Sequence, residues 1–504
     1  MKIKSSIAIL SIILSLLICS MVGFKFTGYI IKNDIEESII CKGCNVILIS
    51  IDTLRADHLS VYGYERETSP NIDLFAKQNI LFKNHHSQIP FTPPSHWSIM
   101  TGLYPHNHNI TMVKNISFDY EGLELKNEEP FPDEIDTNQV RKILVLSKYL
   151  EKKGYKTAGF VSSRMVQSLK VVFQEFEISY DKKGFFPFDF NKNKEKPKFN
   201  KENFFKKFKN NKRNNFTNFF ENNNNLDEEL PEKNNPSFET TEKSLTWLEK
   251  NKNENFFLFI HFWDVHHPYS PPDEYDIFSG ENEDIVKYDG EIKFVDYKVK
   301  LILDKLEKLN LLNDTIILIT ADHGESFEEY DCSDFSKKKQ KCLGHYSSLY
   351  EPEIHVPLIM SIPSYKNSKV IEEVTQSVDI VPSLLYILGF NISKELDGSS
   401  IVPLLFNKPR ENNIAFSELN KGVYNSKSLI SENYKLIKID QNGKSVIKLF
   451  DLEKGEGEDV SIKKNKIKQS LEKEIDKLIQ NKQNFEEEPS KEDMKLLRSL
   501  GYLE

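Results

Sequence analysis

Three apolar runs, each followed by side chains that can do chemistry, restrict the fold of this chain more than any other feature of its sequence. They occupy residues 45–51, 256–261 and 315–320, and they lead into Asp52, into Asp264 and His266, and into Asp322 and His323. Continuous apolar runs of this kind are typical of strands buried on both faces of a parallel sheet. Helical patterns at 140–153 and 290–309 and a further strand-like run at 157–161 are interleaved with them, which predicts an α/β fold with a mainly parallel central sheet flanked by helices. Ligand sites in such sheets collect at the carboxyl ends of the strands, so we expect these polar side chains to converge.

Length and net charge limit the kind of protein. A chain of 504 residues is long enough for one large α/β domain with a smaller appendage, or for two ordinary domains. The formal net charge is −9, whereas a surface that binds nucleic acid usually carries an excess of clustered Lys and Arg. We therefore expect no nucleic-acid partner.

Residues 1–27 have the pattern of a signal peptide or signal anchor. Lys2 and Lys4 precede an apolar stretch at residues 7–24. By the positive-inside rule these lysines stay in the cytoplasm, which predicts an exported chain on the periplasmic or extracellular face, anchored in the inner membrane through this segment. A buried core helix is the alternative interpretation, and the sequence leaves open whether the leader is cleaved. We interpret residues 28–44 as a linker to the first strand.

Four cysteines follow the leader, and an even number in an oxidising compartment suggests disulfides. Cys332 and Cys342 bracket a charged loop, and we expect them to pair. Cys41 and Cys44 allow two interpretations, a local bridge beside the first strand or a metal-binding or redox pair.

Two regions depart from the α/β pattern. Residues 182–236 are rich in Asn and Lys, which predicts an insertion with loose segments; its phenylalanines also fit an amphipathic piece that touches a membrane or a partner. After residue 410, strand patterns at 434–439 and 445–450 flank the hairpin signal Asn442-Gly443 and precede a charged helix at 460–481. We therefore expect a small α+β subdomain and tail over residues 411–504, packed on a main domain over residues 45–410.

Three consecutive segments of the main domain carry a specific family pattern: NVILISIDTLRADHLSVYGY, ETSPNIDLFAKQNILFKN and TPPSHWSIMTGLYPHNHNI. They resemble the N-terminal part of the sulfatase family, in the alkaline phosphatase superfamily. Further similar segments follow in order, among them HFWDVHHPYSPP, ITADHGES and GHYSSLYEPEIHVPLIM, so the resemblance covers nearly the whole chain apart from the leader and the insertion. It implies an alkaline-phosphatase-like fold, with residues 45–410 as the catalytic domain of a bacterial sulfatase-like ester hydrolase.

The resemblance also implies roles for individual residues. A divalent metal would be held by Asp52, Asp322 and His323, with Thr92 as both the nucleophile and the last member of the metal shell. His266 and His345 would bind ester oxygens or protonate the leaving group, and His96 would contact the substrate. Independently of the family, two carboxylates, an imidazole and a hydroxyl suit a hard or borderline cation, so we expect one or two ions of Ca, Mn or Zn.

Three residues depart from the family pattern and bear on the substrate. Authentic sulfatases carry a cysteine or serine, oxidised to formylglycine, at the position of Thr92, so we expect no formylglycine here. His96 replaces the usual arginine, and Thr53 replaces a second aspartate. A hydrated aldehyde expels its bound sulfate by collapsing to the carbonyl, whereas a threonine ester must be attacked again at its central atom, which phosphorus tolerates better.

Three functions therefore compete. The first is a sulfatase-like, metal-dependent hydrolase of sulfuric or phosphoric esters, whose anionic substrate is a sulfated or phosphorylated glycan, lipid or small molecule. The second is a membrane-anchored transferase of the phosphoethanolamine or glycerol-phosphate type, acting on envelope lipid or glycan. The third, a catalytically inactive binding protein, fits poorly with an intact set of metal-binding and nucleophilic residues.

Overall fold

The computed structural model describes residues 38–110, 116–119, 122–125, 143–179, 236–335, 340–391, 396–410, 412–421, 424–441 and 443–480. The expected leader at 1–27 lies outside the described residues, as do the first ten residues of the expected linker. The same holds for the expected insertion at 182–236, except its last residue, and for the tail after residue 480.

The central sheet is built from the apolar runs of the sequence. It has eight strands in the order β13-β2-β12-β9-β1-β8-β6-β7. Its parallel core consists of β1 (Asn45–Ile51), β9 (Thr315–Ala321), β8 (Phe256–Phe262), β6 (Lys156–Val161) and β7 (Glu175–Ile178). At one edge, β12 (Leu358–Ser361) runs antiparallel between β9 and β2 (Ile80–Phe82), and β13 (Lys369–Ile371) pairs parallel with β2. The predicted α/β fold with a mainly parallel central sheet is confirmed.

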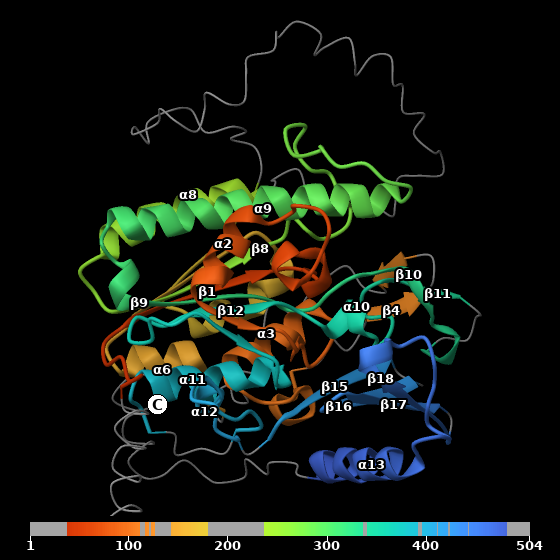
Figure 1. Ribbon diagram of the computed structural model, residues 1–504. Coiled ribbons are helices and arrows are strands. Elements are labelled where there is room, and N and C mark those ends of the chain that lie inside the picture. The colour runs from red at the N-terminus through yellow and green to blue at the C-terminus, as the bar shows by residue number, and fades with distance from the viewer. Residues whose placement is uncertain are drawn as a thin grey trace, which may run out of the picture.

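Helices cover both faces of this sheet (Figure 1). One face packs on α2 (Pro70–Gln78), α8 (Pro236–Asn251) and α9 (Glu283–Lys308). The other packs on α3 (Thr92–Thr101), α6 (Leu146–Lys152), α11 (Ile380–Ile387) and α12 (Val402–Leu405), with the short α4 (Pro105–His108) beyond α3. Successive strand residues point to opposite faces. Ile47 and Ile49 of β1 therefore belong to the first core, and Val46 and Leu48 to the second.

A four-stranded antiparallel sheet follows near the C-terminus (Figure 1). It consists of β15 (Ile414–Lys421), β16 (Tyr424–Ser431), β17 (Tyr434–Gln441) and β18 (Lys444–Asp451), and α13 (Asn465–Gln480) packs on it. The expected hairpin is present, since Gln441 pairs with Lys444 across the turn. β15 and β16 were not expected, because their mixed polar composition carries no clear alternation.

Buried charges join this small sheet to the main part of the chain. Lys435 of β17 is fully buried, and its Nζ lies 2.8 Å from Glu351 Oε1 and 2.8 Å from Glu456 Oε1. Glu351 begins α10 (Glu351–Ile354), which leads into β12. Burial lowers the pKa of Lys435, but the two glutamates outweigh it and raise the pKa, so the lysine keeps its charge.

Two disulfides and three small sheets complete the described structure. Cys332 and Cys342 pair as predicted, and Cys41 pairs with Cys44, in agreement with the interpretation of a local bridge. The small sheets are β10 (Ser326–Asp331) with β11 (Lys341–Gly344), β3 (His85–His86) with β14 (Thr375–Gln376), and β4 (Ile116–Asp119) with β5 (Gly122–Leu125). Across the ranges that the structure describes, no helix combines the length and apolar character needed to span a membrane.

Candidate active site

Residues from three distant segments meet at the carboxyl edge of the central sheet. Asp52 follows β1, and Asp322 and His323 follow the neighbouring strand β9. Thr92 is the first residue of α3. All four residues are at most 1% exposed. The convergence expected from the strand ends is therefore present.

His323 lies at the centre of this group. Its Nε2 is 3.1 Å from Thr92 Oγ1, 3.6 Å from Asp322 Oδ2 and 3.8 Å from Asp52 Oδ1. The ligand atoms of Asp52, Asp322 and His323 all lie within 4.8 Å of one another. The other ring nitrogen, Nδ1, is 3.0 Å from the carbonyl of Gly324. A proton on Nδ1 that is donated to this carbonyl leaves the lone pair of Nε2 facing the carboxylates and Thr92.

The carboxylates of this group lack the partners that buried charges require. Neither oxygen of Asp52 accepts a hydrogen bond from the described residues, and neither does Asp322 Oδ2. Asp322 Oδ1 accepts from the backbone N–H groups of His323, at 2.9 Å, and Thr53, at 3.3 Å. Burial, reinforced by the nearby Asp322, raises the pKa of Asp52 well above its ordinary value. Orphaned carboxylate oxygens beside an imidazole and a hydroxyl fit a divalent cation, because a cation would supply the missing compensation.

The start of α3 holds Thr92 against this group. Thr92 is followed by Pro93 and Pro94, whose fixed φ angles favour the first turn of a helix. Ser95 Oγ donates to the backbone carbonyl of Asp322 at 2.6 Å, and Ser87 Oγ donates to the same carbonyl. Because the two prolines have no N–H, this helix terminus offers fewer donors to an anion than usual, so charge on an ester must be met by side chains or a metal.

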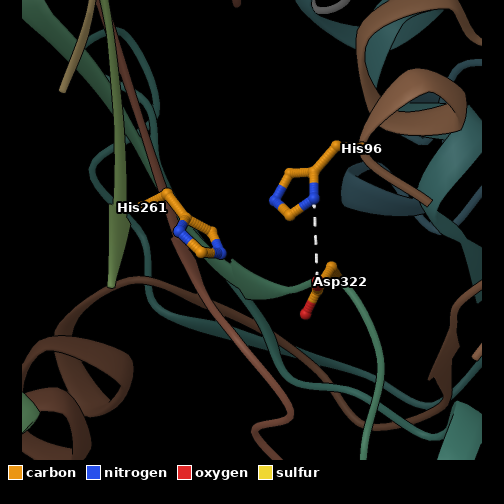
Figure 2. Close-up of side chains that lie close together, drawn as sticks. All are labelled: His96, His261 and Asp322. Atoms are coloured by element: carbon orange, nitrogen blue, oxygen red, sulfur yellow. Dashed lines mark ion pairs between the residues drawn. The ribbon is translucent and has the colours of Figure 1, made fainter. Parts of the chain in front are cut away.

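His96 lies one turn after Thr92 and faces Asp322 (Figure 2). His96 Nδ1 is 2.8 Å from the carbonyl of Thr92 and 3.6 Å from Asp322 Oδ2, and His96 Nε2 is 3.0 Å from Ser50 Oγ. His261, the penultimate residue of β8, approaches from the other side. Both rings are fully buried, and burial lowers the pKa of each to about 4. They are therefore neutral at neutral pH.

Comparison with known proteins identifies the family. The sulfatase family model matches residues 44–390, which includes the whole site and more than half of the chain. The chain belongs to the sulfatase family. A second model, for the C-terminal region of N-sulphoglucosamine sulphohydrolase, matches residues 345–485. The expectations of a sulfatase-like chain and of an enzyme of the ester hydrolase class agree with this result.

Individual relatives of this sulfatase match over different lengths. Human arylsulfatase H is 30% identical over 194 residues, which cover 36% of this chain and 33% of the relative, so the match spans a third of that protein. An arylsulfatase of Clostridium perfringens (strain 13 / Type A) is 22% identical over 464 residues, or 81% of this chain and 88% of the relative. Among solved structures, Ps i-CgsB in complex with k-i-k-neocarrahexaose has a similar fold, with a TM-score of 0.62, 21% identity and coverage of 90% of this chain and 97% of that one.

Two further histidines of the sulfatase lie on the more open side of the cluster. His345 is in ring contact with His323 and with His266, at centroid distances of 4.5 and 4.9 Å. Burial lowers the pKa of His345, but the Glu325 carboxylate, 3.2 Å from its Nδ1, outweighs that effect and raises the pKa to about 9. His266 stacks on Trp263, and burial lowers its pKa well below the ordinary value. A protonated His345 beside a neutral His266 suits acid catalysis and the binding of anionic oxygens.

Several supporting residues of this sulfatase were missed by sequence reasoning. Glu353 is fully buried and accepts hydrogen bonds from the backbone N–H groups of Ser347 and Ser348, which fixes the loop after His345. Lys298 of α9 is fully buried and pairs with Asp264, two residues before His266. The sequence did carry a signal for Lys298, because this lysine lies among the apolar residues of one face of a predicted helix.

Two more departures from expectation concern β1 and β8. Thr53, at the position of a second aspartate, donates its hydroxyl to the carbonyl of Val265 at 2.8 Å, so it links the end of β1 to the loop that carries His266. His261 was read only as the end of a strand. The sequence signal was its spacing: residues 257, 259 and 261 of a strand point to the same face, and His261 is a polar residue on a face that otherwise carries Phe257 and Phe259.

Proposed function

We propose that this member of the sulfatase family is a metal-dependent hydrolase of sulfuric or phosphoric esters that uses Thr92 as its nucleophile. The observation that carries the proposal is the position of Thr92 Oγ1, 3.1 Å from His323 Nε2 at the edge of the Asp52, Asp322 and His323 cluster. The sulfatase family is metal-dependent. In the proposal, Asp52, Asp322, His323 and Thr92 hold the ion.

The residues of the chain divide the chemistry between them. Bound here, a divalent cation would lower the pKa of the Thr92 hydroxyl and neutralise charge on the ester oxygens. Thr92 releases its hydroxyl proton to solvent and its Oγ1 attacks the sulfur or phosphorus, while the bond to the leaving oxygen breaks and protonated His345 gives its proton to that oxygen. Water then attacks the same centre and gives a proton to the now neutral His345, the bond to Thr92 Oγ1 breaks, and Thr92 takes a proton from solvent to restore its hydroxyl. His266 contacts the substrate in this scheme, and Ser95 keeps Thr92 in place through the Asp322 carbonyl.

Thr92 favours phosphoric over sulfuric esters within this class. The second half-reaction requires attack on a threonine ester, because threonine lacks the aldehyde exit of formylglycine, and phosphorus tolerates that attack better than sulfur. We therefore expect diesters or monoesters of phosphate to be turned over faster than sulfates, and no formylglycine at residue 92. A sulfated or phosphorylated glycan, lipid or small molecule remains the proposed substrate class.

The same threonine, with the apolar segment at residues 7–24, supports a second candidate function. A transferase held at the outer face of the inner membrane would pass its phosphoryl-linked group to an envelope lipid or glycan in place of water. We propose the same exported location for the hydrolase, with residues 45–410 as the catalytic domain and residues 411–504 as a subdomain and tail.

Turnover by purified full-length protein tests the proposal. The substrates are an aryl sulfate, an aryl phosphate monoester, an aryl phosphate diester and an aryl phosphonate, each with Ca, Mn or Zn and with EDTA. We expect metal-dependent phosphate-ester turnover that Thr92→Ala abolishes and Thr92→Ser, which keeps a hydroxyl, retains in part. Turnover that survives Thr92→Ala contradicts the nucleophile, and full activity after metal removal contradicts the metal. A large share of product formed on an added alcohol acceptor favours the transferase, and absence of turnover with every substrate favours a binding protein.

A further inference from the structure

A second set of possible metal ligands, His96, His261 and Asp322, lies close together in the site (Figure 2). The ligand atoms of His96, His261 and Asp322 lie within 4.8 Å of one another, as do those of Asp52, Asp322 and His323. Asp322 therefore belongs to both sets. His96 comes from α3 and His261 from β8, so the two imidazoles reach Asp322 from different layers of the fold.

His261 is a buried imidazole without a hydrogen bond to the described residues. The side chain is 0% exposed, and neither ring nitrogen makes a hydrogen bond with any residue that the structure describes. A neutral imidazole always carries one N–H, and a buried donor without a partner costs about 1–3 kcal/mol. Phe257 and Phe259 occupy the preceding inward-facing positions of β8, so an apolar side chain would suit this place if packing were its only task.

The nearest charged atom to His261 belongs to Asp52. His261 Nε2 lies 3.2 Å from Asp52 Oδ2, whereas His323 Nε2 lies 3.8 Å from Asp52 Oδ1. The two oxygens of Asp52 thus face different histidines, and neither accepts a hydrogen bond from the described residues. A carboxylate in this position can bridge two cations, one on each side.

His96 has a hydroxyl partner that can set its tautomer for metal binding. Ser50 Oγ, 3.0 Å from His96 Nε2, can accept a proton from that nitrogen. Nδ1 then presents its lone pair towards Asp322 Oδ2, 3.6 Å away. Without a cation, Nδ1 instead carries the proton and donates it to the Thr92 carbonyl at 2.8 Å, so a cation at Nδ1 requires the tautomer in which Nε2 donates to Ser50.

We propose that His96, His261 and Asp322, with Asp52 Oδ2, bind a second divalent cation beside the one held by Asp52, Asp322, His323 and Thr92. Two imidazoles with carboxylate oxygens select a borderline ion such as Zn²⁺ over Ca²⁺. The second ion compensates the charge on Asp322 and Asp52, and it satisfies the orphaned ring of His261. The proposal shares Asp322 and Asp52 with the proposed function but does not depend on which ester is cleaved.

Zinc stoichiometry of the full-length chain tests the second site without measuring activity. Metal-stripped protein is equilibrated with excess Zn²⁺, freed of unbound metal and analysed by elemental mass spectrometry. We expect two zinc ions per chain in the wild type, and one in His261→Gln and in His96→Gln. His267→Gln, an exposed residue outside both sets, is the matched control and should keep two. One zinc in the wild type, or two in His261→Gln, overturns the proposal.

X-ray absorption at the zinc edge provides a readout that does not depend on variants that fold. Wild-type protein loaded with two zinc ions should show more than one imidazole per zinc on average, because three histidines are shared between two ions. An average of one imidazole per zinc or fewer contradicts the second site. Loss of turnover in Thr92→Ala with two zinc ions still bound would leave this site intact, and absence of turnover with two zinc ions bound would count against the proposed function alone.

Discussion

Asp52→Asn should stabilise the metal-free protein, although it removes a residue that we assign to the active site. Both carboxylate oxygens of Asp52 are buried and accept no hydrogen bond from the described residues, and burial followed by the charge of Asp322 raises the Asp52 pKa. A buried ion without a partner costs several kcal/mol, whereas a neutral amide of the same shape avoids that penalty. We expect the asparagine variant to gain about 2–4 kcal/mol in free energy of unfolding at neutral pH.

The gain should be visible in thermal melting. With an unfolding entropy of about 2.1 cal/mol/K per residue and on the order of 350 folded residues, 3 kcal/mol corresponds to a rise in Tm of about 4 °C. Since the pKa of Asp52 is raised above its unfolded value of 3.8, the penalty is absent below that pH, grows as pH rises from 3.8 towards the folded pKa, and is complete above it. The difference in Tm between variant and wild type in EDTA should therefore widen from pH 4 towards neutral.

With metal bound, the wild type should melt at a higher temperature than Asp52→Asn, the reverse of the order expected in EDTA. At a free ion concentration of about 100 times Kd, the wild type gains roughly 2.7 kcal/mol from binding, and Asp52→Asn gains much less. Asp57→Asn is the matched control, because Asp57 loses the same charge but is 58% exposed and paired with Arg55 at 2.7 Å, so this change should bring no gain. An Asp52→Asn variant that melts below wild type in EDTA, or a difference that does not change with pH, would refute the reasoning.

Three further predictions concern the support of the site. Ser95→Ala removes the hydrogen bond to the Asp322 carbonyl, so we expect a loss of about 1–3 kcal/mol in urea unfolding and a lower kcat with little change in KM; an unchanged kcat would contradict the positioning role. His345 holds its proton up to about pH 9 beside Glu325, and a bound cation lowers that limit, so kcat/KM should fall as pH rises through this value or somewhat below it. That alkaline limb should disappear in His345→Gln, and its persistence would point to another acid. Lys435→Met leaves the buried Glu456 and the partly buried Glu351 without their cation, so we expect a loss of about 3–5 kcal/mol in thermal or urea unfolding, and a neutral effect would show that the network contributes little.

Much of the fold could be predicted because its signals are local. The runs that form β1, β8 and β9 are apolar throughout, as strands covered on both faces must be, and their bounds in the structure differ from the expected ones by at most one residue. The helix α9 begins at Glu283 instead of 290, because the Asn282 side chain caps it by accepting from the backbone N–H groups of Asp284 and Ile285. The edge strands β2, β12 and β13 are only three or four residues long, too short to show a period.

The sequence by itself determined the meeting of Asp52 with Asp322 and His323, since neighbouring parallel strands end at the same edge, and their catalytic and metal-binding roles stay predictions. Only the tertiary structure decided which side chains surround them. Ser95 binds a carbonyl 227 positions away, and His261 reaches Asp52 from another strand. Such contacts depend on strand order and on how α3 packs across the sheet, and packing between segments so far apart leaves no periodic trace in either one.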